Sequence, residues 1–464
     1  MRFTKFGKAL CIGALSAGVI LGITSCVQSY STGYLYVTGT VTASTGNNGI
    51  ISGVRIDHNT GAMGQINGLP ISSGGANPVR AVLAASSTFL YVLNRGVAST
   101  APPGGTVADC FGTGAYECQG ASIVQFAVGG NGSLTFQNTF YSQGLNPFRM
   151  ILDSSGSYMM ILDHDAPDNV SPSSKDNCAA ALGNVVASES IPYTCGDITI
   201  FKINQTTGYL SLVQNTQATS NAGKTVTYFP VPANPVDFVL DGSYVYTLTG
   251  APAPTTYPYT GGTAVWPYTY SGGQLTVSSN GVQTLTTTAV TVTQANTIDL
   301  AGGVIYVLDN ETAAGSSADQ IIPYNASSGV LYEEASGVIP DNSTLANPTQ
   351  VLLESKGKFL YVANQGNNTT TANEASGIAG YLITTSPSYQ ATFIAGEPFG
   401  SGAAPQCIVE DPSGQFIYEA NEYDSTLTGR VVDPNSGVLD DMRVTSTYKL
   451  EGPASWCIMD GRTN

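Results

Sequence analysis

Residues 347–366 read NPTQVLLESKGKFLYVANQG, and this stretch predicts one strand, a tight turn and a second strand. Pro348 favours an extended start because proline fixes its own φ and disfavours helix in the residue before it. An apolar run from Val351 follows, and Lys356-Gly357 then offers a turn. The second run, Phe359-Leu360-Tyr361-Val362, holds the aromatic and β-branched residues that suit a half-buried pleated surface. A β-hairpin is therefore expected here.

The same hairpin pattern recurs along the chain and divides it into seven units. Most units add a third strand of alternating pattern, such as Ile123-Val124-Gln125-Phe126, and a fourth after a glycine turn, such as Ser133-Leu134-Thr135-Phe136. The units begin at Gly33, Asn77, Asn146, Asn234, near Asn296, at Asn347 and at Ala404. Four short strands joined by turns make one blade, so the repeat predicts an all-β, seven-bladed β-propeller of four-stranded antiparallel blades.

The two ends of the repeat are complementary. The first unit lacks the opening strand that the others possess, while Trp456-Cys457-Ile458-Met459-Asp460 repeats that strand at the end of the chain. We therefore expect the C-terminal strand to complete the first blade, which closes the ring and removes free sheet edges. Residues 33–464 are expected to form a single propeller domain.

Composition supports a large, loop-rich β protein. The 464 residues are 42% hydrophobic and only 10% charged, with 53 glycines and 24 prolines. Asp and Glu number 32 against 16 Lys and Arg. A surface this acidic repels nucleic-acid phosphates and anionic headgroups, so nucleic-acid binding is excluded from the expected functions.

The N-terminus carries an export pattern. Arg2, Lys5 and Lys8 precede an apolar stretch over residues 9–23, as in the basic and hydrophobic regions of a signal peptide. Ile23-Thr24-Ser25-Cys26 resembles a bacterial lipobox, in which the cysteine is lipidated and becomes the new N-terminus. We expect a signal peptide over residues 1–25, a lipidated Cys26 that starts a short linker over 26–32, and a protein exported to the bacterial cell envelope. An ordinary signal peptide that contains a cysteine is the alternative.

Cysteine usage agrees with an oxidising compartment. Of eight cysteines, Cys11 leaves with the signal peptide and Cys26 is lipidated, so six remain and 15 pairings are formally possible. Spacing favours three disulfides, namely Cys110–Cys118, Cys178–Cys195 and Cys407–Cys457. Neither a CxxC pair nor a nearby histidine points to metal binding, so no metal and no cofactor is expected.

Aligning the opening strands selects one residue per unit, just before the apolar run. These residues are Arg80, Arg149, Asp237, Asp299, Gln350, Cys407 and Cys457. Equivalent positions in a propeller form a circle, so we expect a polar ring around the central channel, with two neighbouring arginines facing two neighbouring aspartates across it. Paired guanidinium groups suit a carboxylate or phosphate, which makes the first five residues candidate binding residues. Alternatively, the arginines pair with the aspartates or with nearby carbonyl groups.

The repeats resemble those of the lactonase-like seven-bladed propellers with YVTN-type motifs. The resemblance lies in Tyr361-Val362-Ala363-Asn364, Tyr91-Val92-Leu93-Asn94 and Tyr306-Val307-Leu308-Asp309, and in the glycine turns at 59–63 and 435–439. It spans nearly the whole mature chain and implies the propeller fold. Because the family includes sugar-lactone hydrolases beside binding and structural members, it leaves the function open.

The resemblance also implies that the enzymes of this family carry Pro-Arg-His in an opening strand. No unit of this chain has it, and the only two histidines, His58 and His164, are expected in a surface turn and in an insertion. In a lactone hydrolase, Asp237 would activate water and Arg149 would stabilise the developing oxyanion. Arg80 and Asp299 are the other catalytic candidates. The missing histidine favours binding over catalysis.

Extra length falls between the second and third strands of several units, at residues 95–121, 164–196, 250–263 and 365–377. These insertions are expected to emerge on one face of the ring, where loops commonly carry binding residues. The acidic run 163–169 has enough oxygen ligands for calcium, but it lacks the spacing and glycine of a calcium loop, so a solvated turn is expected.

These patterns predict a lipid-anchored, monomeric propeller outside the cytoplasm that binds a ligand or acts as a scaffold at the cell envelope. The partner is expected to be a small acidic or carbohydrate-derived ligand or an envelope protein, with membrane contact only through the lipid. The alternative is a hydrolase that opens a sugar-derived lactone, as in the 6-phosphogluconolactonase-like family.

Overall fold

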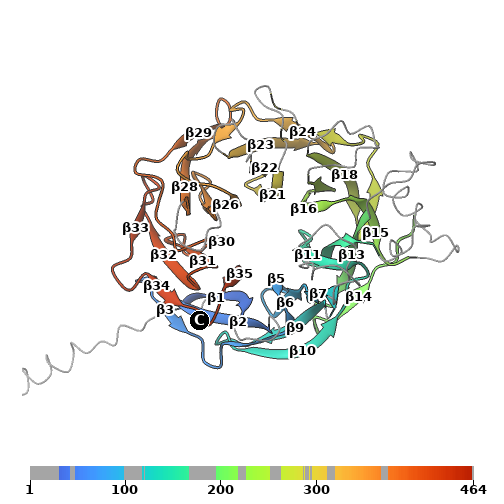
Figure 1. Ribbon diagram of the computed structural model, residues 1–464, viewed down its shortest axis with the longest axis horizontal. Coiled ribbons are helices and arrows are strands. Elements are labelled where there is room, and N and C mark those ends of the chain that lie inside the picture. The colour runs from blue at the N-terminus through green and yellow to red at the C-terminus, as the bar shows by residue number, and fades with distance from the viewer. Residues whose placement is uncertain are drawn as a thin grey trace, which may run out of the picture.

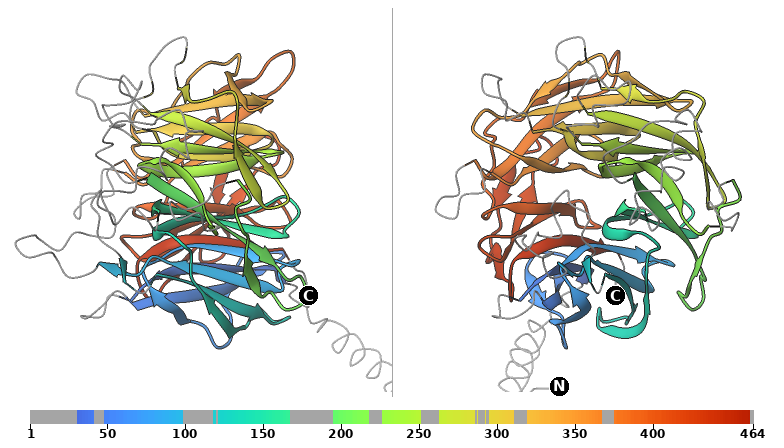
Figure 2. Two further views of the ribbon diagram at one scale, coloured as in Figure 1. Left: turned by 90° about the vertical axis from the view of Figure 1, so that its right-hand side faces the viewer. Right: turned by 45° about the vertical axis from the view of Figure 1, so that its right-hand side comes forward.

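The computed structural model describes residues 31–41, 48–98, 118–119, 121–166, 195–217, 226–250, 263–285, 287, 292, 295–310, 319–366 and 375–461. The predicted signal peptide and Cys26 fall outside these residues, as do Cys110, Cys178 and most of the insertions. Every regular element described is a β-strand, and none of these residues form a helix that could cross a membrane. Seven antiparallel sheets surround one axis, as Figure 1 shows from above and Figure 2 from the side. The predicted seven-bladed propeller is confirmed.

Each blade places four main strands in sequence from the channel to the rim. From blade 1 to blade 7, the inner strands are β35 (Ala454–Asp460), β5 (Pro78–Ala84), β11 (Leu145–Leu152), β16 (Pro235–Asp241), β21 (Ala295–Ala301), β26 (Pro348–Leu353) and β30 (Pro405–Glu410). The second strands are β1 (Ser31–Thr40), β6 (Phe89–Asn94), β12 (Tyr158–Asp165), β17 (Tyr244–Thr249), β22 (Val304–Asp309), β27 (Phe359–Asn364) and β31 (Phe416–Asn421).

The outer half of each blade is built by the third and fourth strands. The third strands are β2 (Asn48–Asp57), β9 (Ser122–Val128), β13 (Cys195–Ile203), β18 (Ala264–Ser271), β23 (Gln320–Ser327), β28 (Gly377–Thr384) and β32 (Thr426–Val432). The fourth strands are β3 (Met63–Gln65), β10 (Leu134–Phe140), β14 (Leu210–Leu212), β19 (Gln274–Val277), β24 (Val330–Glu333), β29 (Gln390–Phe393) and β33 (Leu439–Asp441).

Short additional strands extend the rim. Five of them pair with a third strand beside the fourth, namely β4 (Ile71–Ala76), β15 (Phe229–Ala233), β20 (Gln283–Thr284), β25 (Ile339–Pro340) and β34 (Thr447–Lys449). A separate hairpin of β7 (Val97–Ala98) and β8 (Cys118–Gln119) joins the two ends of the 95–121 insertion.

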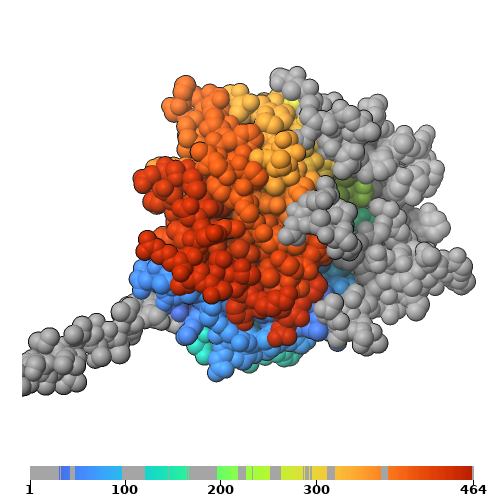
Figure 3. Space-filling model, turned by 60° about the vertical axis from the view of Figure 1, so that its left-hand side comes forward, coloured from blue at the N-terminus to red at the C-terminus, as the bar shows by residue number. Residues whose placement is uncertain are grey.

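The first blade is completed by the end of the chain. Its strand order is β3-β2-β1-β35, and Val37 of β1 lies opposite Cys457 of β35. In Figure 3 the red C-terminal blade adjoins the blue first blade on the outer surface. The predicted closure by a C-terminal strand is therefore confirmed, and it leaves no gap in the ring.

The hydrophobic core lies between neighbouring blades, and the second strands show why. In β6 all six residues are buried. Leu90 and Val92 pack toward blade 1, whereas Tyr91 and Leu93 pack toward blade 3. A strand that is buried on both faces needs apolar residues at consecutive positions. This explains the unbroken apolar runs of the repeat.

The repeated tyrosine of the second strand fastens its blade to the next one. The Tyr361 hydroxyl in blade 6 donates to the carbonyl of Gly437 in the outer turn of blade 7, at 2.7 Å. Tyr418 in blade 7 donates likewise to Gly61 of blade 1, at 2.8 Å. Gly437 has a φ of 75°, and a Cβ there would lie 2.4 Å from the Phe359 ring, so the turn requires glycine. The tyrosine and the glycine turn of the repeat therefore interact with each other, the tyrosine of one blade with the glycine turn of the next.

Asparagine before proline sets the start of an inner strand. Asn347 has a left-handed φ of 58°, which asparagine tolerates better than most residues, and its amide donates to the Gly366 carbonyl at 2.7 Å. Positive φ values recur at Asn77, Asn146 and Asn234. After Pro348, Thr349 bulges out of the strand pairing, and the next residue, Gln350, lines the channel.

Candidate functional site: a ring in the central channel

The bulge fixes which residue of each blade belongs to the channel ring. The ring residue lies opposite the second residue after the second-strand tyrosine, or after Met160 in blade 3, as Arg80 does opposite Leu93. By this register the ring consists of Trp456, Arg80, Arg149, Asp237, Thr297, Gln350 and Cys407. The register agrees with five of the positions predicted from the sequence and contradicts two.

The two errors occur where the inner strand begins without proline. Five blades have proline two residues before the ring position, but blades 5 and 1 have alanine there. The predicted alignment therefore slips by two residues to Asp299 and by one residue to Cys457. The tyrosine of the second strand lies opposite the residue two beyond the ring.

Several ring side chains fasten their blade to the inner strand of the next. Asp237 Oδ2 accepts the N–H of Ile298 at 3.3 Å, and Gln350 Oε1 accepts the N–H of Ile408 at 2.9 Å. Each of these N–H groups belongs to the residue after the ring position. Because an inner strand has no further strand beside it, these side chains satisfy backbone donors that would otherwise face the channel.

The two residues displaced from the predicted ring make the same connection. Asp299 points the same way as Thr297 because strand side chains alternate, and its Oδ2 accepts the Val351 N–H at 3.3 Å. Cys407 and Cys457 are disulfide-bonded, and Cys457 is the residue after the ring position of blade 1. The disulfide thus replaces the hydrogen bond that joins other blades.

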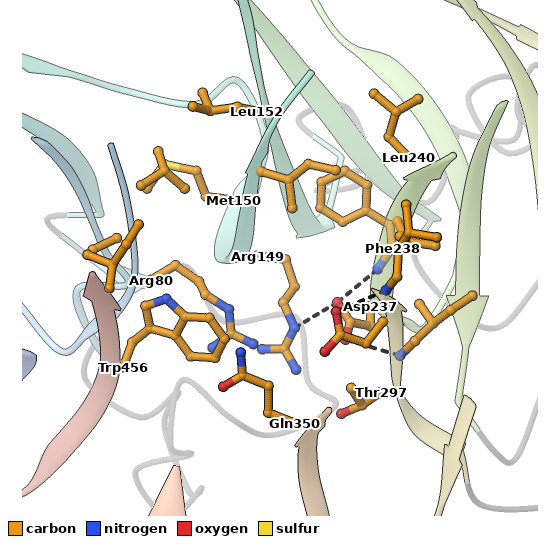
Figure 4. A pocket seen from close by; sticks show the side chains of 18 of the residues that line it. Arg80, Arg149, Met150, Leu152, Asp237, Phe238, Leu240, Thr297, Gln350 and Trp456 are labelled. Carbon is orange, nitrogen blue, oxygen red and sulfur yellow. Dashed lines mark hydrogen bonds and ion pairs between the residues drawn. The ribbon is translucent and has the colours of Figure 1, made fainter. Parts of the chain in front are cut away.

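Arg149 and Asp237 form the ion pair of the ring, which Figure 4 shows from close by. Arg149 Nε lies 2.9 Å from Asp237 Oδ1, and the side chains are 21% and 8% exposed. Arg149 Nη1 also donates to the Phe148 carbonyl at 3.4 Å. The arginine therefore reaches sideways to blade 4, whereas the sequence predicted arginines that face aspartates across the channel.

Arg80 has no carboxylate partner in the described part of the chain. Its guanidinium carbon lies 3.8 Å from the centroid of the Trp456 ring (Figure 4). Its Nη1 donates to the Val79 carbonyl at 3.0 Å. Burial and the neighbouring charge of Arg149 lower the pKa of Arg80, because both disfavour a charged guanidinium. The protein therefore compensates this positive charge only in part.

The junction between blades 2 and 3 differs from those that follow it. It holds two donors, Arg80 and Arg149, and among the described residues no side chain accepts the N–H of Met150. The register makes Met150 equivalent to Ile298, whose N–H is held by Asp237. This junction therefore holds donor side chains at the position where each of the three junctions between blades 4 and 7 has an acceptor side chain. An anion would supply the missing acceptor.

Two cavities meet at the arginine pair. The channel cavity, of about 480 Å³, is lined by the ring and by apolar side chains of the inner strands such as Leu152 and Leu240. The vestibule, of about 780 Å³, lies at the other end of the ring, where it is lined by Gln365, Glu422 and the arginine pair. Both volumes fall in the range of ligand pockets, roughly 300–1,000 Å³.

Asp299 has the most perturbed carboxyl group of the channel. Burial, followed by the charge of Asp237, raises the pKa of Asp299 to about 7. In the unfolded chain an aspartate titrates near ~3.9. Between these values the folded protein binds a proton that the unfolded chain has released, so the free energy of unfolding falls as pH rises through this window.

Urea unfolding at pH 5 and pH 8 should therefore give a higher free energy of unfolding at pH 5. One such proton contributes a slope of at most about 1.4 kcal/mol per pH unit. Burial raises the pKa of Asp341 and Glu419 as well, so Asp299→Asn should reduce the difference between the two pH values without removing it. A wild-type stability that increases toward pH 8, or an unchanged slope in the variant, would contradict this assignment.

The two histidines lie outside both cavities. His58 is exposed in the turn after β2, and His164 lies on β12, with its ring 6.2 Å from that of Phe148. Within the described ranges no group of three or more acidic, histidine or cysteine side chains is arranged to hold a metal. Residues 167–169 of the acidic run fall outside the described residues. Cys110 and Cys178, the predicted disulfide partners of Cys118 and Cys195, also fall outside them.

The comparison with known proteins supports the resemblance seen in the repeats. Residues 301–457 match the family model described as Lactonase, 7-bladed beta-propeller. No curated protein sequence matches the chain significantly.

Solved structures match over most of the chain. A candidate 6-phosphogluconolactonase of Bacteroides uniformis has a TM-score of 0.59 and 14% identity, with 93% of this chain and 100% of that chain covered. The periplasmic gluconolactonase PpgL of Pseudomonas aeruginosa gives 0.56 and 14%, with 92% and 99% covered. A hypothetical selenium-binding protein of Sulfolobus tokodaii gives 0.57 and 10%, with 94% and 95% covered. At such identities the likeness concerns the fold alone. The chain is therefore a seven-bladed propeller that is similar in sequence to the lactonase family over residues 301–457 and similar in fold to these structures over most of its length.

Proposed function

We propose that this protein is a binding protein of the cell envelope whose channel holds a small organic acid between Arg80 and Arg149. The observation that carries the proposal is the junction of blades 2 and 3, where among the described residues no carboxylate pairs with Arg80 and no side chain accepts the Met150 N–H, while Arg149 pairs sideways with Asp237 of blade 4. A carboxylate offers two oxygens to planar guanidinium donors. It would also balance the charge that burial and repulsion disfavour.

The overall composition supports the proposal. The chain has 16 basic against 32 acidic residues, so two neighbouring arginines at its centre do not reflect a generally basic sequence. Burying like charges side by side lowers stability unless a counter-charge is present. Features that lower stability are expected mainly where they serve a function.

A lactone hydrolase is the second candidate, because a carboxyl group with a pKa of about 7, such as that of Asp299, suits a general base. However, Asp299 Oδ1 accepts the Leu300 N–H at 3.0 Å, and its Oδ2 accepts that of Val351. Asp237 is held in the same way and also pairs with Arg149. Carboxylates held by backbone donors are poorly placed to take a proton from water, so the geometry favours binding.

The proposed location rests on the sequence alone. The signal-peptide pattern and the lipobox-like residues before Cys26 favour a lipid anchor that holds a monomeric propeller outside the cytoplasm. In that position the protein would capture its ligand, or contact an envelope protein, without any other membrane contact.

Tryptophan fluorescence offers a direct test, because the chain has only two tryptophans and Trp456 stacks on Arg80. In a Trp266→Phe background, saturable changes are expected on addition of short carboxylates or inorganic phosphate, but not of the matching alcohols or alkylammonium ions. The same protein should open gluconolactone no faster than buffer does. Saturation by none of these anions would overturn the binding proposal, and lactone turnover would favour the hydrolase.

A further inference from the structure

We infer that the bound acid carries an apolar body, which lies in the channel cavity beyond the arginine pair. The ligand class is thus a monocarboxylate with a short alkyl or aryl tail rather than a polyhydroxylated acid. This inference rests on the proposed function, because Arg80 and Arg149 are taken to hold the acid group.

The wall of the channel cavity is the first support. Beyond the ring, six of the seven inner strands line the channel with further apolar residues, among them Val82, Ile151, Leu152, Val239, Leu240 and Val409. In Figure 4, Met150, Leu152 and Leu240 lie together on one side of the arginine pair. An apolar tail placed there would leave water for an apolar wall, which is favourable in proportion to the area buried.

The scarcity of polar partners in this cavity is the second support. Beyond the ring position, the lining side chains are apolar except for the carboxyl group of Asp299, whose oxygens already accept two backbone N–H groups. The hydroxyl of Thr349, just before the ring, already lies 3.2 Å from the carbonyls of Ala363 and Pro405. Sugar hydroxyls moved from water into such a cavity would lose hydrogen bonds without replacement.

The vestibule is less suited to the body of an acid. Its Glu422 carboxylate accepts hydrogen bonds from Gln365 Nε2 at 3.2 Å and from Gln406 Nε2 at 2.8 Å. These two amides are therefore already used by the protein, and the negative charge of Glu422 repels an acidic ligand. A ligand with its acid group at the arginines gains more by directing its body into the channel cavity.

A homologous series tests the inference with the Trp266→Phe protein. Affinities would be measured by Trp456 fluorescence for acetate, butyrate, hexanoate and gluconate, the last being a six-carbon acid with a hydroxylated tail. Each buried methylene is expected to strengthen binding about fourfold, so hexanoate, which has four more methylenes than acetate, should bind on the order of a few hundredfold more tightly than acetate, whereas gluconate should gain nothing comparable from its hydroxylated tail. Leu152→Gln should flatten the series while acetate still binds, and Leu212→Gln, at an exposed leucine of β14 in the same blade, should leave it unchanged.

The outcomes separate this inference from the proposed function. A series that rises with chain length and is flattened by Leu152→Gln supports the apolar body. Equal affinities for acetate and hexanoate, or tighter binding of gluconate, would overturn it and leave the arginine site intact. If no carboxylate in the series changes the fluorescence, the anion site itself is wrong, and the inference fails with it.

Discussion

The Arg80→Gln variant should lose its bound anion while keeping or gaining stability. Charge-assisted hydrogen bonds contribute about 1.5–3 kcal/mol each, so removal of one guanidinium should weaken anion binding by roughly 10- to 100-fold. In the free protein, however, Arg80 is a partly buried cation beside another cation, and no carboxylate of the described chain pairs with it. Glutamine at this position removes the repulsion from Arg149 and can still donate to the Val79 carbonyl.

Two other variants define the expected pattern. Arg149→Gln should weaken both binding and folding, because it leaves the Asp237 carboxylate without its partner at 2.9 Å. Arg443→Gln, at an exposed arginine of blade 7, should change neither. Titration with hexanoate and urea unfolding of the same samples would give both quantities. A clear loss of stability in Arg80→Gln without loss of binding would show that Arg80 serves the fold and not a ligand.

The fold could be predicted from the sequence because its determinants are local and repeated. The asparagine and proline before an inner strand, the consecutive apolar residues of a second strand and the glycine turns each follow from backbone conformation or from burial on two faces. Seven copies of the pattern leave little ambiguity. The missing opening strand of the first unit and the extra C-terminal strand gave the closure, which the pairing of β35 with β1 confirms.

The ring could be predicted only in part, because its register depends on a single bulge. Where proline marks the strand start, as before Arg80 and Arg149, the predicted position agrees with the pairing. Where alanine replaces this proline, alignment on the apolar run gives a wrong register. The ring residues Thr297 and Trp456 were therefore not predicted. Side-chain direction was also beyond the sequence, since nothing in the motif shows that Arg149 turns toward Asp237 while Arg80 stacks on Trp456.

Removal of the Cys407–Cys457 disulfide should lower the free energy of unfolding by about 4 kcal/mol, the chain-entropy value for a loop of this size. The bond joins residues 50 apart and connects blade 7 to the strand that closes blade 1. Without it, the unfolded chain regains the freedom of that loop. The comparison is between urea unfolding of the wild-type protein and of the Cys407→Ser/Cys457→Ser variant, each with and without reductant.

The position of this disulfide indicates where the propeller should open first. Asp237, Asp299 and Gln350 use one hydrogen bond each to hold the next inner strand, and their sheets are built from consecutive strands of the chain. Blade 1 instead joins the two ends of the chain, so within its sheet β35 is held by pairing with β1 alone, and the disulfide adds a covalent link to blade 7. In the serine variant, amide hydrogen exchange should accelerate first in β35 and β1. Reductant added to the serine variant breaks the other two predicted disulfides, so any further loss of stability measures their contribution separately from that of Cys407–Cys457. Uniform exchange across all seven blades would instead show that the ring unfolds as one unit whether or not its closure is covalent.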